Sequence, residues 1–356
     1  MADILKPVTQ PTRPPFVVVA GAPRSGTYLM VTHLEQHFSV ATPLETHFIP
    51  LFNTWKFLWG DLSDKENRRV LVDDIFVFLE IWARASRVDA PEMAEFNLLT
   101  TREHAQQVID HASSYAEIVQ TLFRCYADLH QKQLAGEKSA FYSLIPLAKT
   151  AECFGESVRV LHIVRDGRDV ARSWMSMWTG PETLTAAALL WKGQVRQKRQ
   201  WGASAPDHYL EVRYEDLLSD PVGCNSKISE FLGVPVSAAE HQRMSDILSS
   251  LPTHQKISGG LKQNNSLKWR SEMSVGEQKL FEYYAADVLA EFSYEQVGFT
   301  YTLADRCYYA ALRAGAAIRR VFSMKRWKNR IKTILPPLIW LARKVGLKSL
   351  LIRLAT

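Results

Sequence analysis

A glycine-rich turn follows the first apolar run of the sequence, in the stretch VVVAGAPRSGTYLM at residues 17–30. Its two glycines have the spacing of the nucleotide-phosphate loop G-x-x-x-x-G-K-[ST]. Thr27 stands at the lysine position, however, and Tyr28 at the position of the metal-binding hydroxyl. Backbone N–H groups at the start of a helix form an anion cradle, and Arg24 adds a charged, planar fork. The stretch predicts a phosphate or sulfate site, with an ordinary strand-to-helix turn as the alternative.

A second charged turn follows another apolar run, in VLHIVRDGRDVARSW at residues 160–174. The pattern predicts a buried strand, a turn and a helix, with Arg165 at the end of the strand and Ser173 about two helical turns further on. A guanidinium and a hydroxyl in that arrangement can reach one phosphate group. A solvated turn is the alternative interpretation of the charge-rich RDGRD.

Together the two stretches resemble the cofactor motifs of sulfotransferases that use 3′-phosphoadenosine 5′-phosphosulfate (PAPS). PRSGTYLM resembles their 5′-phosphosulfate loop, and VRDGRDVARSW resembles their 3′-phosphate motif. Four shorter segments resemble other family motifs and occur in the family's order: ETHF, GEKS, RYEDLLSDP and SLKWR. The resemblance runs from residue 16 to about residue 295. It is closest to the branch that contains tyrosylprotein, carbohydrate and many bacterial sulfotransferases.

The resemblance implies which residues bind PAPS. The loop would hold the 5′-phosphosulfate, Arg165 and Ser173 would bind the 3′-phosphate, and Tyr214 would lie near the nucleotide. The late SLKWR segment would fold over the cofactor. The implied cofactor-binding residues are Arg24, Ser25, Gly26, Thr27, Tyr28, Arg165, Ser173, Tyr214, Ser266, Lys268 and Arg270. Tyr28 departs from the family, which usually has a second Thr at this position. The backbone N–H of Tyr28 can still contact the cofactor, but the contact of a Thr hydroxyl is lost.

Sulfuryl transfer depends on positioning and charge stabilisation more than on covalent chemistry. The resemblance implies in-line attack by an acceptor hydroxyl, with Arg24 and Lys138, from GEKS, stabilising the leaving oxygen without a metal. A base must also take the hydroxyl proton. Glu45, in ETHF, matches the family's glutamate base, and His47 is the second candidate. The alternatives are a surface turn for Lys138 and a solvated loop for Glu45 and His47.

Three apolar runs bounded by turn residues predict buried parallel strands, at residues 16–22, 158–166 and 209–216. Longer segments with helical spacing separate these runs. One of them, residues 115–129, has an apolar stripe made of Tyr115, Ile118, Val119, Leu122, Tyr126 and Leu129. Alternating strands and helices predict an α/β fold: a three-layer, P-loop-type parallel sheet flanked by helices, with a basic C-terminal helical tail. Ligands of such sheets bind at the carboxyl ends of the strands, where the first anion motif lies.

Length and composition indicate one catalytic domain with appendages. The 356 residues, of which 47% are hydrophobic, can bury one large core or two modest ones. We expect a flexible, Pro-rich leader at residues 1–15, the catalytic domain at 16–300 and a basic extension at 301–356. The four cysteines form no C-x-x-C pair, which indicates a reducing compartment and neither a disulfide framework nor a zinc cluster.

Charge is unevenly distributed along the chain. The net charge of +6 combines +12 in residues 301–356, where thirteen Lys and Arg residues accompany Asp305 as the single acid, with −6 in the rest. Apolar and basic residues interleave in this tail, and no run approaches the roughly 18 apolar residues of a membrane span. These patterns predict a cytoplasmic protein that binds an anionic membrane surface peripherally. Docking of an acidic partner and simple packing of the tail on the body are the alternatives.

Two other patterns have competing interpretations. HLEQH places His33 and His37 one helical turn apart, but the spacing differs from the zinc motif H-E-x-x-H, so no metal site is expected. Large aromatic residues at irregular spacing are typical of a core. The clustered tryptophans are Trp55, Trp59, Trp174, Trp178 and Trp191. For Trp55 and Trp59, which follow Glu45, an acceptor pocket is the alternative to the core.

The sequence therefore predicts a PAPS-dependent sulfotransferase that needs no metal. Its acceptor would be a hydroxyl of a glycan, glycolipid, tyrosine peptide or other secondary metabolite, including carrier-bound hydroxyls. A degenerate P-loop nucleotide kinase or NTPase is the alternative enzyme class, which the missing loop lysine disfavours. We expect no nucleic-acid partner, because residues 1–300 carry a net negative charge and contain no known nucleic-acid-binding motif.

Overall fold

The computed structural model describes residues 14–43, 45–85, 100–139, 144–177, 180–236, 266–322 and 334–347. In this part of the chain the strands are β1 Phe16–Gly21, β2 Val40–Ala41, β3 Leu134–Ser139, β4 Val158–Val164 and β5 Tyr209–Arg213. The α-helices are α1 Thr27–Phe38, α2 Phe48–Trp55, α3 Lys65–Ala85, α5 Arg102–Val108, α6 Tyr115–Leu129, α7 Leu144–Phe154, α8 Gly167–Met175, α9 Leu184–Ser204, α10 Tyr214–Ser219, α11 Pro221–Leu232, α13 Trp269–Glu272, α14 Val275–Glu291, α15 Leu303–Phe322 and α17 Leu335–Lys344.

The strands form a parallel sheet with the order β2-β3-β1-β4-β5, so β1 lies at its centre. Val19 of β1 lies beside Lys138 of β3, and Gly21 lies beside Ile163 of β4. Parallel strands end at a common edge, where ligands of open α/β sheets bind. The register therefore brings the glycine-rich loop, the GEKS segment and the RDGRD turn to one edge of the sheet.

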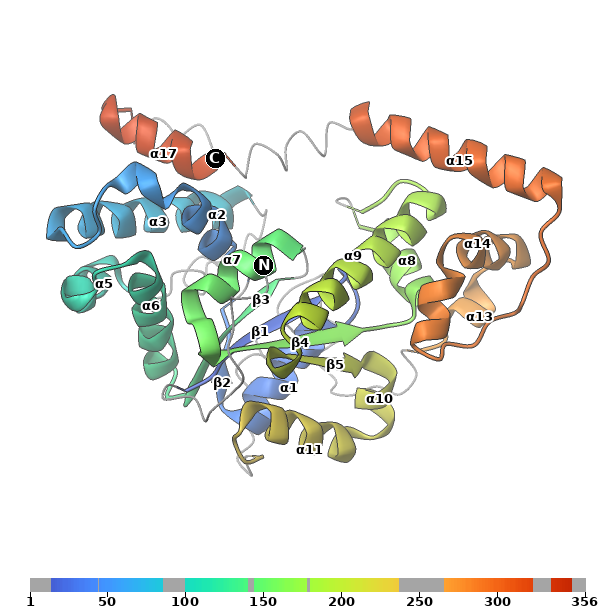
Figure 1. Ribbon diagram of the computed structural model, residues 1–356, viewed down its shortest axis with the longest axis horizontal. Coiled ribbons are helices and arrows are strands. Elements are labelled where there is room, and N and C mark those ends of the chain that lie inside the picture. The colour runs from blue at the N-terminus through green and yellow to red at the C-terminus, as the bar shows by residue number, and fades with distance from the viewer. Residues whose placement is uncertain are drawn as a thin grey trace.

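Helices cover both faces of the sheet. Alternate residues of β1 point to opposite sides: Phe16 and Val18 join a core with α2, α3, α6 and α7, whereas Val17 and Val19 join a core with α1, α10 and α11. Figure 1 shows the sheet between these two groups, with α10 and α11 below it and α7, α2 and α3 above it. A third cluster joins α8, α9, α13, α14 and α15 beyond the strand ends. The helices of these clusters thus surround the sheet that carries the candidate site.

The predicted fold class is confirmed: the chain forms a three-layer α/β structure with a parallel sheet. The three predicted strands correspond to β1, β4 and β5, and residues 115–129 form α6. Leu129 was wrongly placed in the apolar stripe, because it is the last residue of α6 and its side chain is exposed. The sequence did not reveal β2, which has two residues, or β3, whose sequence LAGEKS has few apolar residues.

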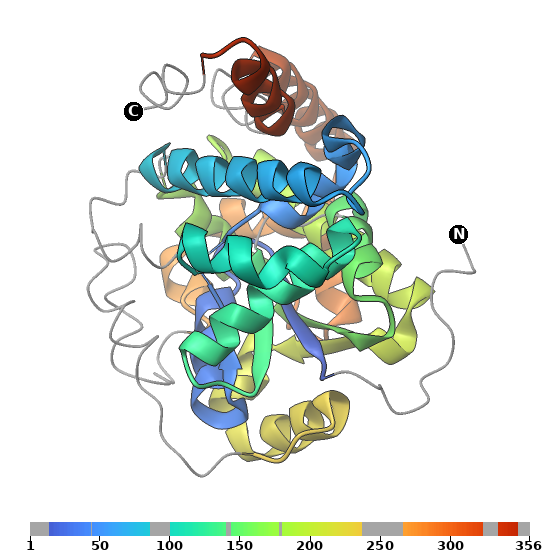
Figure 2. The ribbon, with the colours of Figure 1, turned by 90° about the vertical axis from the view of Figure 1, so that its left-hand side faces the viewer.

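The two helices of the C-terminal extension pack against the body at separate places. Tyr309 of α15 is buried in the cluster with α9 and α14, and Ile339 of α17 is buried in the core with α2 and α3. Figures 1 and 2 both show α15 and α17 along the same side of the molecule. Among the described residues, no helix combines the length and the apolar character needed to cross a bilayer. Residues 1–13 of the expected leader, and Trp178, lie outside the described residues.

Candidate active site

The glycine-rich loop joins β1 to α1 in a closed turn. Gly26 has a φ of 100°, which favours glycine, and a Cβ atom there would lie 2.5 Å from the ring of Tyr214. The Ser25 hydroxyl donates to the carbonyl oxygen of Ala22 at 2.6 Å and closes the turn. Because α1 begins at Thr27, its first N–H groups have no acceptor within the helix. The loop therefore has the form of an anion cradle.

Arg24 connects the loop to the second motif. Its Nε atom donates to Ser173 Oγ on α8 at 3.0 Å, across 149 residues of sequence. Arg165, the first residue after β4, places Nη1 at 3.5 Å from the carbonyl oxygen of Arg24. Arg24 therefore contacts both Ser173 and Arg165, and the two predicted anion motifs lie side by side.

Arg24 and Arg165 place two guanidinium groups close together at this edge of the sheet. Burial lowers the pKa of Arg24, and the nearby charge of Arg165 lowers it further. Arg165 lies over Tyr214, with the guanidinium carbon 4.5 Å from the ring centroid, and its Nη2 is 3.5 Å from Asp169 Oδ2. Two guanidinium groups held this close repel each other, and bound phosphate would relieve that repulsion. The residues present thus fit a ligand with two anionic ends.

Lys138 and Glu45 form an ion pair beside the loop, in which Nζ donates to Oε1. The other carboxylate oxygen, Oε2, lies 3.5 Å from Nε2 of His47. The Lys138 ammonium also lies 3.5 Å from the ring centroid of Tyr28, within the range of a cation–π contact. The side chain of Lys138 is 2% exposed and that of Glu45 is 23% exposed. The interpretations as a surface lysine and a fully solvated loop are therefore wrong.

Glu137, next to Lys138 in β3, holds the backbone of the same loop. Its Oε1 atom accepts hydrogen bonds from Thr46 Oγ1 at 2.8 Å and from the backbone N–H of His47 at 3.1 Å. Neighbouring strand residues point to opposite faces, so β3 fixes the ETHF loop from two directions. Glu137 was not among the predicted site residues, because the strand that contains it was itself not recognised from the sequence.

The surroundings of Glu45 determine its charge. Burial alone would raise the pKa of this carboxyl, but the Lys138 ammonium and the His47 side chain together hold the pKa well below its ordinary value. The carboxyl is therefore ionised at neutral pH. Burial lowers the pKa of Lys138, and Glu45 opposes that change. A proton acceptor and a cation thus lie side by side, next to the anion cradle.

The late SLKWR segment is anchored to α8. The backbone N–H of Trp269 donates to Asp169 Oδ1 at 2.8 Å, and Asp169 also faces Arg165. Arg270 is half-exposed and forms an ion pair with Glu295. The two other predicted residues of the segment, Ser266 and Lys268, are partly buried. The structure brings the segment beside the second anion motif but pairs the Arg270 side chain with Glu295.

The RDGRD turn is buried, so its interpretation as a solvated turn is wrong. Arg168 is fully buried and pairs with Asp166 Oδ2 at 2.7 Å and with Glu282 Oε1 of α14 at 3.2 Å. Its guanidinium carbon also lies 3.4 Å from the ring centroid of Trp269. Arg168 therefore ties the start of α8 to α14 and to the late segment.

Replacing Arg168 by leucine is expected to lower the free energy of unfolding by about 3–5 kcal/mol, because two buried carboxylates lose their counter-charge. Urea denaturation measures this change. Arg172→Leu is the matched control on the same helix: its side chain is partly exposed and pairs with Glu272, so a loss of less than about 1 kcal/mol is expected. Equal losses in the two variants would contradict the bridging role of Arg168.

Most of the clustered tryptophans belong to the core. Three of them are buried: Trp59, Trp174 and Trp191. Trp55 is partly buried against the same core as Trp59. The tryptophan that adjoins the loop is Trp82 of α3, whose ring centroid is 4.5 Å from that of His47. Nothing in the sequence marks Trp82, because only the contact between α3 and the loop reveals it.

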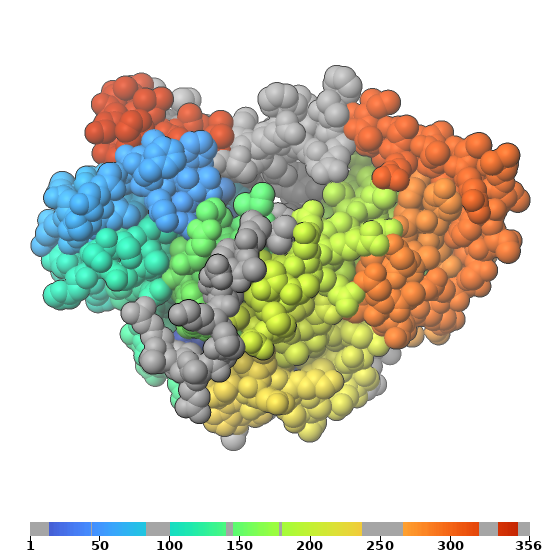
Figure 3. Space-filling model, viewed as in Figure 1, coloured from blue at the N-terminus to red at the C-terminus, as the bar shows by residue number. Residues whose placement is uncertain are grey.

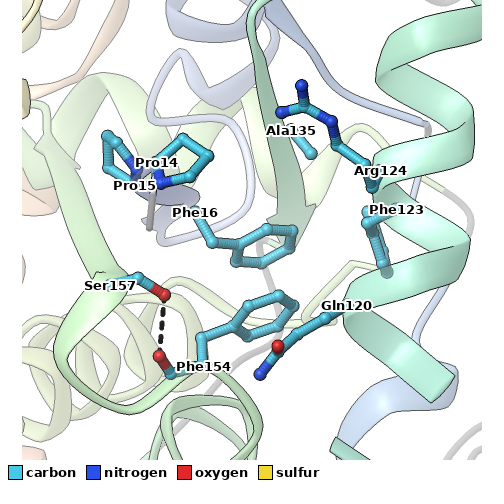
Figure 4. A pocket seen from close by; sticks show the side chains of 9 residues that line it. All are labelled: Pro14, Pro15, Phe16, Gln120, Phe123, Arg124, Ala135, Phe154 and Ser157. Atoms are coloured by element: carbon cyan, nitrogen blue, oxygen red, sulfur yellow. Dashed lines mark hydrogen bonds between the residues drawn. The ribbon is translucent and has the colours of Figure 1, made fainter. Parts of the chain in front are cut away.

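Two other features lie away from this site. His33 Nε2 is 2.5 Å from Asn225 Oδ1 of α11, so its partner is an amide. A pocket of about 280 Å³ lies at the amino end of β1, and Figure 4 shows the stacked rings of Phe16 and Phe154 on its wall. That end of β1 is the opposite end from the glycine-rich loop, so the pocket belongs to a different edge of the sheet.

Comparisons with known proteins agree with this fold. The family model described as Sulfotransferase family matches residues 15–238 of the chain. The chain is similar to the sulfotransferase domain from the Synechococcus PCC 7002 olefin synthase, with a TM-score of 0.51 and 20% identity over 82% of this chain and 99% of that chain. It is also similar to the sulfotransferase domain from the curacin biosynthetic pathway, with a TM-score of 0.51 and 18% identity over 80% of this chain and 99% of that chain. No curated protein matches the sequence. Because the family match covers more than half of the residues, the chain belongs to the sulfotransferase family.

Proposed function

We propose that this protein transfers the sulfuryl group of PAPS to a hydroxyl acceptor. The observation that carries the proposal is the hydrogen bond between Arg24 Nε and Ser173 Oγ, because it joins the two anion motifs in one site. A site with two anion-binding parts suits a nucleotide that carries charged groups at both the 5′ and the 3′ position. Membership of the sulfotransferase family supports sulfuryl transfer as the reaction.

The anion motifs would divide the donor between them. The 5′-phosphosulfate would be held by Arg24, Ser25, Gly26, Thr27 and the N–H of Tyr28, and the 3′-phosphate by Arg165 and Ser173. Tyr214 would pack beside the nucleotide, since it already contacts Gly26 and Arg165. Ser266, Lys268 and Arg270 would cover the donor, for which Arg270 would have to leave Glu295.

The chemistry would be an in-line displacement at sulfur. PAPS supplies the sulfuryl group and a phosphate leaving group. The acceptor oxygen forms the new bond to sulfur as the bond from sulfur to the phosphate oxygen breaks, and Glu45 takes the hydroxyl proton. Arg24 and Lys138 stabilise the charge on the leaving oxygen. His47 and Trp82 would line the acceptor side, next to Glu45.

The ion pair between Glu45 and Lys138 would control how strong a base Glu45 is. A carboxylate with a strongly lowered pKa is a weak base at neutral pH. Lys138 lies between Glu45 and the loop, so an anion in the loop would share its ammonium. The pKa of Glu45 would then rise, and the base would strengthen once the donor is in place. The ring of Tyr28 supports the ammonium throughout, which gives this departure from the family a role that a threonine could not fill.

Binding of two nucleotides tests the donor assignment. Wild-type protein is expected to bind adenosine 3′,5′-bisphosphate more tightly than 5′-AMP in calorimetric titrations. Arg165→Ala should weaken bisphosphate binding roughly 10- to 150-fold, because hydrogen bonds to charged groups contribute about 1.5–3 kcal/mol, and should leave 5′-AMP binding unchanged. Ser176→Ala is the matched control, since this hydroxyl on the next turn donates to Ser173 O and is exposed.

Two outcomes would contradict the assignment. An equal loss of affinity for both nucleotides in Arg165→Ala would show that Arg165 does not bind the 3′-phosphate. Mg²⁺-dependent consumption of ATP, without label transfer from ³⁵S-PAPS, would favour a nucleotide kinase or NTPase.

The acceptor class and the residues of the catalytic unit are further parts of the proposed function. The two similar domains come from an olefin synthase and from the curacin biosynthetic pathway. The acceptor classes for a ³⁵S-PAPS screen are glycans, glycolipids, tyrosine peptides and other secondary metabolites, including carrier-bound hydroxyls. We assign catalysis to residues 16–300, because every residue of the site lies there, and a separate role to residues 301–356.

A further inference from the structure

The outward face of α15 is apolar. Tyr309 anchors the helix in the core, and Lys279 of α14 pairs with Asp305 at 2.9 Å. The side chains on the opposite face follow a three- and four-residue spacing and are exposed: Leu303, Cys307, Ala310, Ala314 and Ile318. Leu303 is 78% exposed and Ile318 is 60% exposed. A surface helix normally turns its apolar stripe inward, so α15 has a second apolar stripe toward solvent.

The outward face of α17 has the same character. Its inner face is held by buried Ile339 and by Arg343, whose Nε donates to buried Asp74 at 3.1 Å. Ile334, Leu341 and Val345 recur at spacings of seven and four residues on the other side. The exposed fractions of Leu341 and Val345 are 50% and 58%. Two separate helices thus present solvent-exposed apolar stripes in the described part of the chain.

Cations flank both stripes. Arg306 and Arg313 lie seven residues apart, along one edge of the α15 stripe, and Arg319 lies on its other edge; all three are exposed. Lys344 is exposed beside the α17 stripe. The sequence of residues 301–356 carries a net charge of +12, whereas the rest of the chain carries −6, so the extension as a whole is attracted to anionic surfaces.

The two stripes lie on the same side of the molecule. Figures 1 and 2 place α15 and α17 along one side in perpendicular views, and in Figure 3 the two helices form the upper right and upper left rims. Apolar side chains flanked by cations are typical of helices that lie in a membrane interface. A soluble polyanion would match the cations but would leave the apolar stripes uncovered.

We propose that the α15–α17 face docks on an anionic lipid surface. The apolar stripes enter the interface between headgroups and acyl chains, and the flanking arginines contact the lipid phosphates. The proposal does not depend on the identity of the donor or the acceptor.

Flotation with lipid vesicles tests the charged part of this face. The full chain is expected to float with vesicles of phosphatidylcholine and phosphatidylglycerol, and not with phosphatidylcholine alone, in 0.15 M salt. Arg306→Glu/Arg313→Glu should weaken binding by roughly thirtyfold or more, since each cation at an anionic surface contributes about 1 kcal/mol. The matched control is Arg124→Glu/Lys227→Glu, which makes the same charge change on α6 and α11 and should float like wild type.

The apolar part of the face distinguishes a membrane from a soluble acidic partner. Ile318→Asp/Leu341→Asp is expected to reduce flotation and to leave binding to polyglutamate unchanged. Flotation of this variant at the wild-type level would overturn the proposal in favour of an acidic partner, and failure of the wild type to float would overturn it outright. Because the four substituted side chains are exposed and lie outside the residues assigned to catalysis, each variant should keep the wild-type thermal midpoint and bisphosphate affinity.

Discussion

Replacing Glu45 by glutamine is expected to lower kcat about 100- to 10,000-fold, because the amide cannot accept the hydroxyl proton. Glutamine has nearly the same shape and can still accept a hydrogen bond from Lys138, so the loop should remain in place. The affinity for adenosine 3′,5′-bisphosphate should change little, since the anion motifs are intact. Single-turnover transfer from ³⁵S-PAPS measures the rate, and calorimetry measures the affinity.

Two companion variants make this result specific to proton transfer. Removing one member of a buried ion pair destabilises a protein, because the other charge is left unpaired. The double variant Glu45→Gln/Lys138→Met removes both charges, so it should regain stability while its kcat stays low. His47→Gln tests the second candidate base. A large loss of kcat in His47→Gln, with little loss in Glu45→Gln, would make the histidine the base.

Replacing Lys138 by methionine is expected to lower kcat about 100- to 1000-fold, the usual effect of removing one group that stabilises charge in the transition state. The change should also move the pH dependence of kcat/KM. Burial raises the pKa of Glu45, and in the wild type the Lys138 ammonium and His47 overcome that effect. Without the ammonium the pKa of Glu45 rises, and a higher pH is needed to keep the base ionised.

The acidic limb of the kcat/KM profile should therefore shift upward by about 1–3 pH units in Lys138→Met, the usual effect of one adjacent opposite charge. Tyr28→Phe is the control for this shift, because it keeps the aromatic ring beneath the ammonium. An unchanged acidic limb in Lys138→Met would show that Lys138 does not set the pKa of the base.

The fold class was predictable because three of the strands have mostly apolar sequences. β1, β4 and β5 are short, apolar and bounded by turn residues, and these properties identify a buried strand in any context. β3 has the opposite composition, because Glu137 and Lys138 occupy a buried strand, where each finds its partner on the loop of residues 45–47. Such a strand cannot be recognised until the loop that satisfies its charges is in place.

By itself, the sequence determined which family the chain resembles and predicted two anion motifs, because loop spacing and residue type are local properties. Only the tertiary structure decided that Arg24 reaches Ser173, that Lys138 lies between Glu45 and Tyr28, and that α15 and α17 turn apolar stripes outward. These contacts join segments that are far apart in the chain. They arise from the register of the parallel strands and from the packing of helices around the sheet. Charge pairing, burial and exposure are properties of the packed chain, so the charge state of Glu45 and the exposed apolar stripes of α15 and α17 come from the fold.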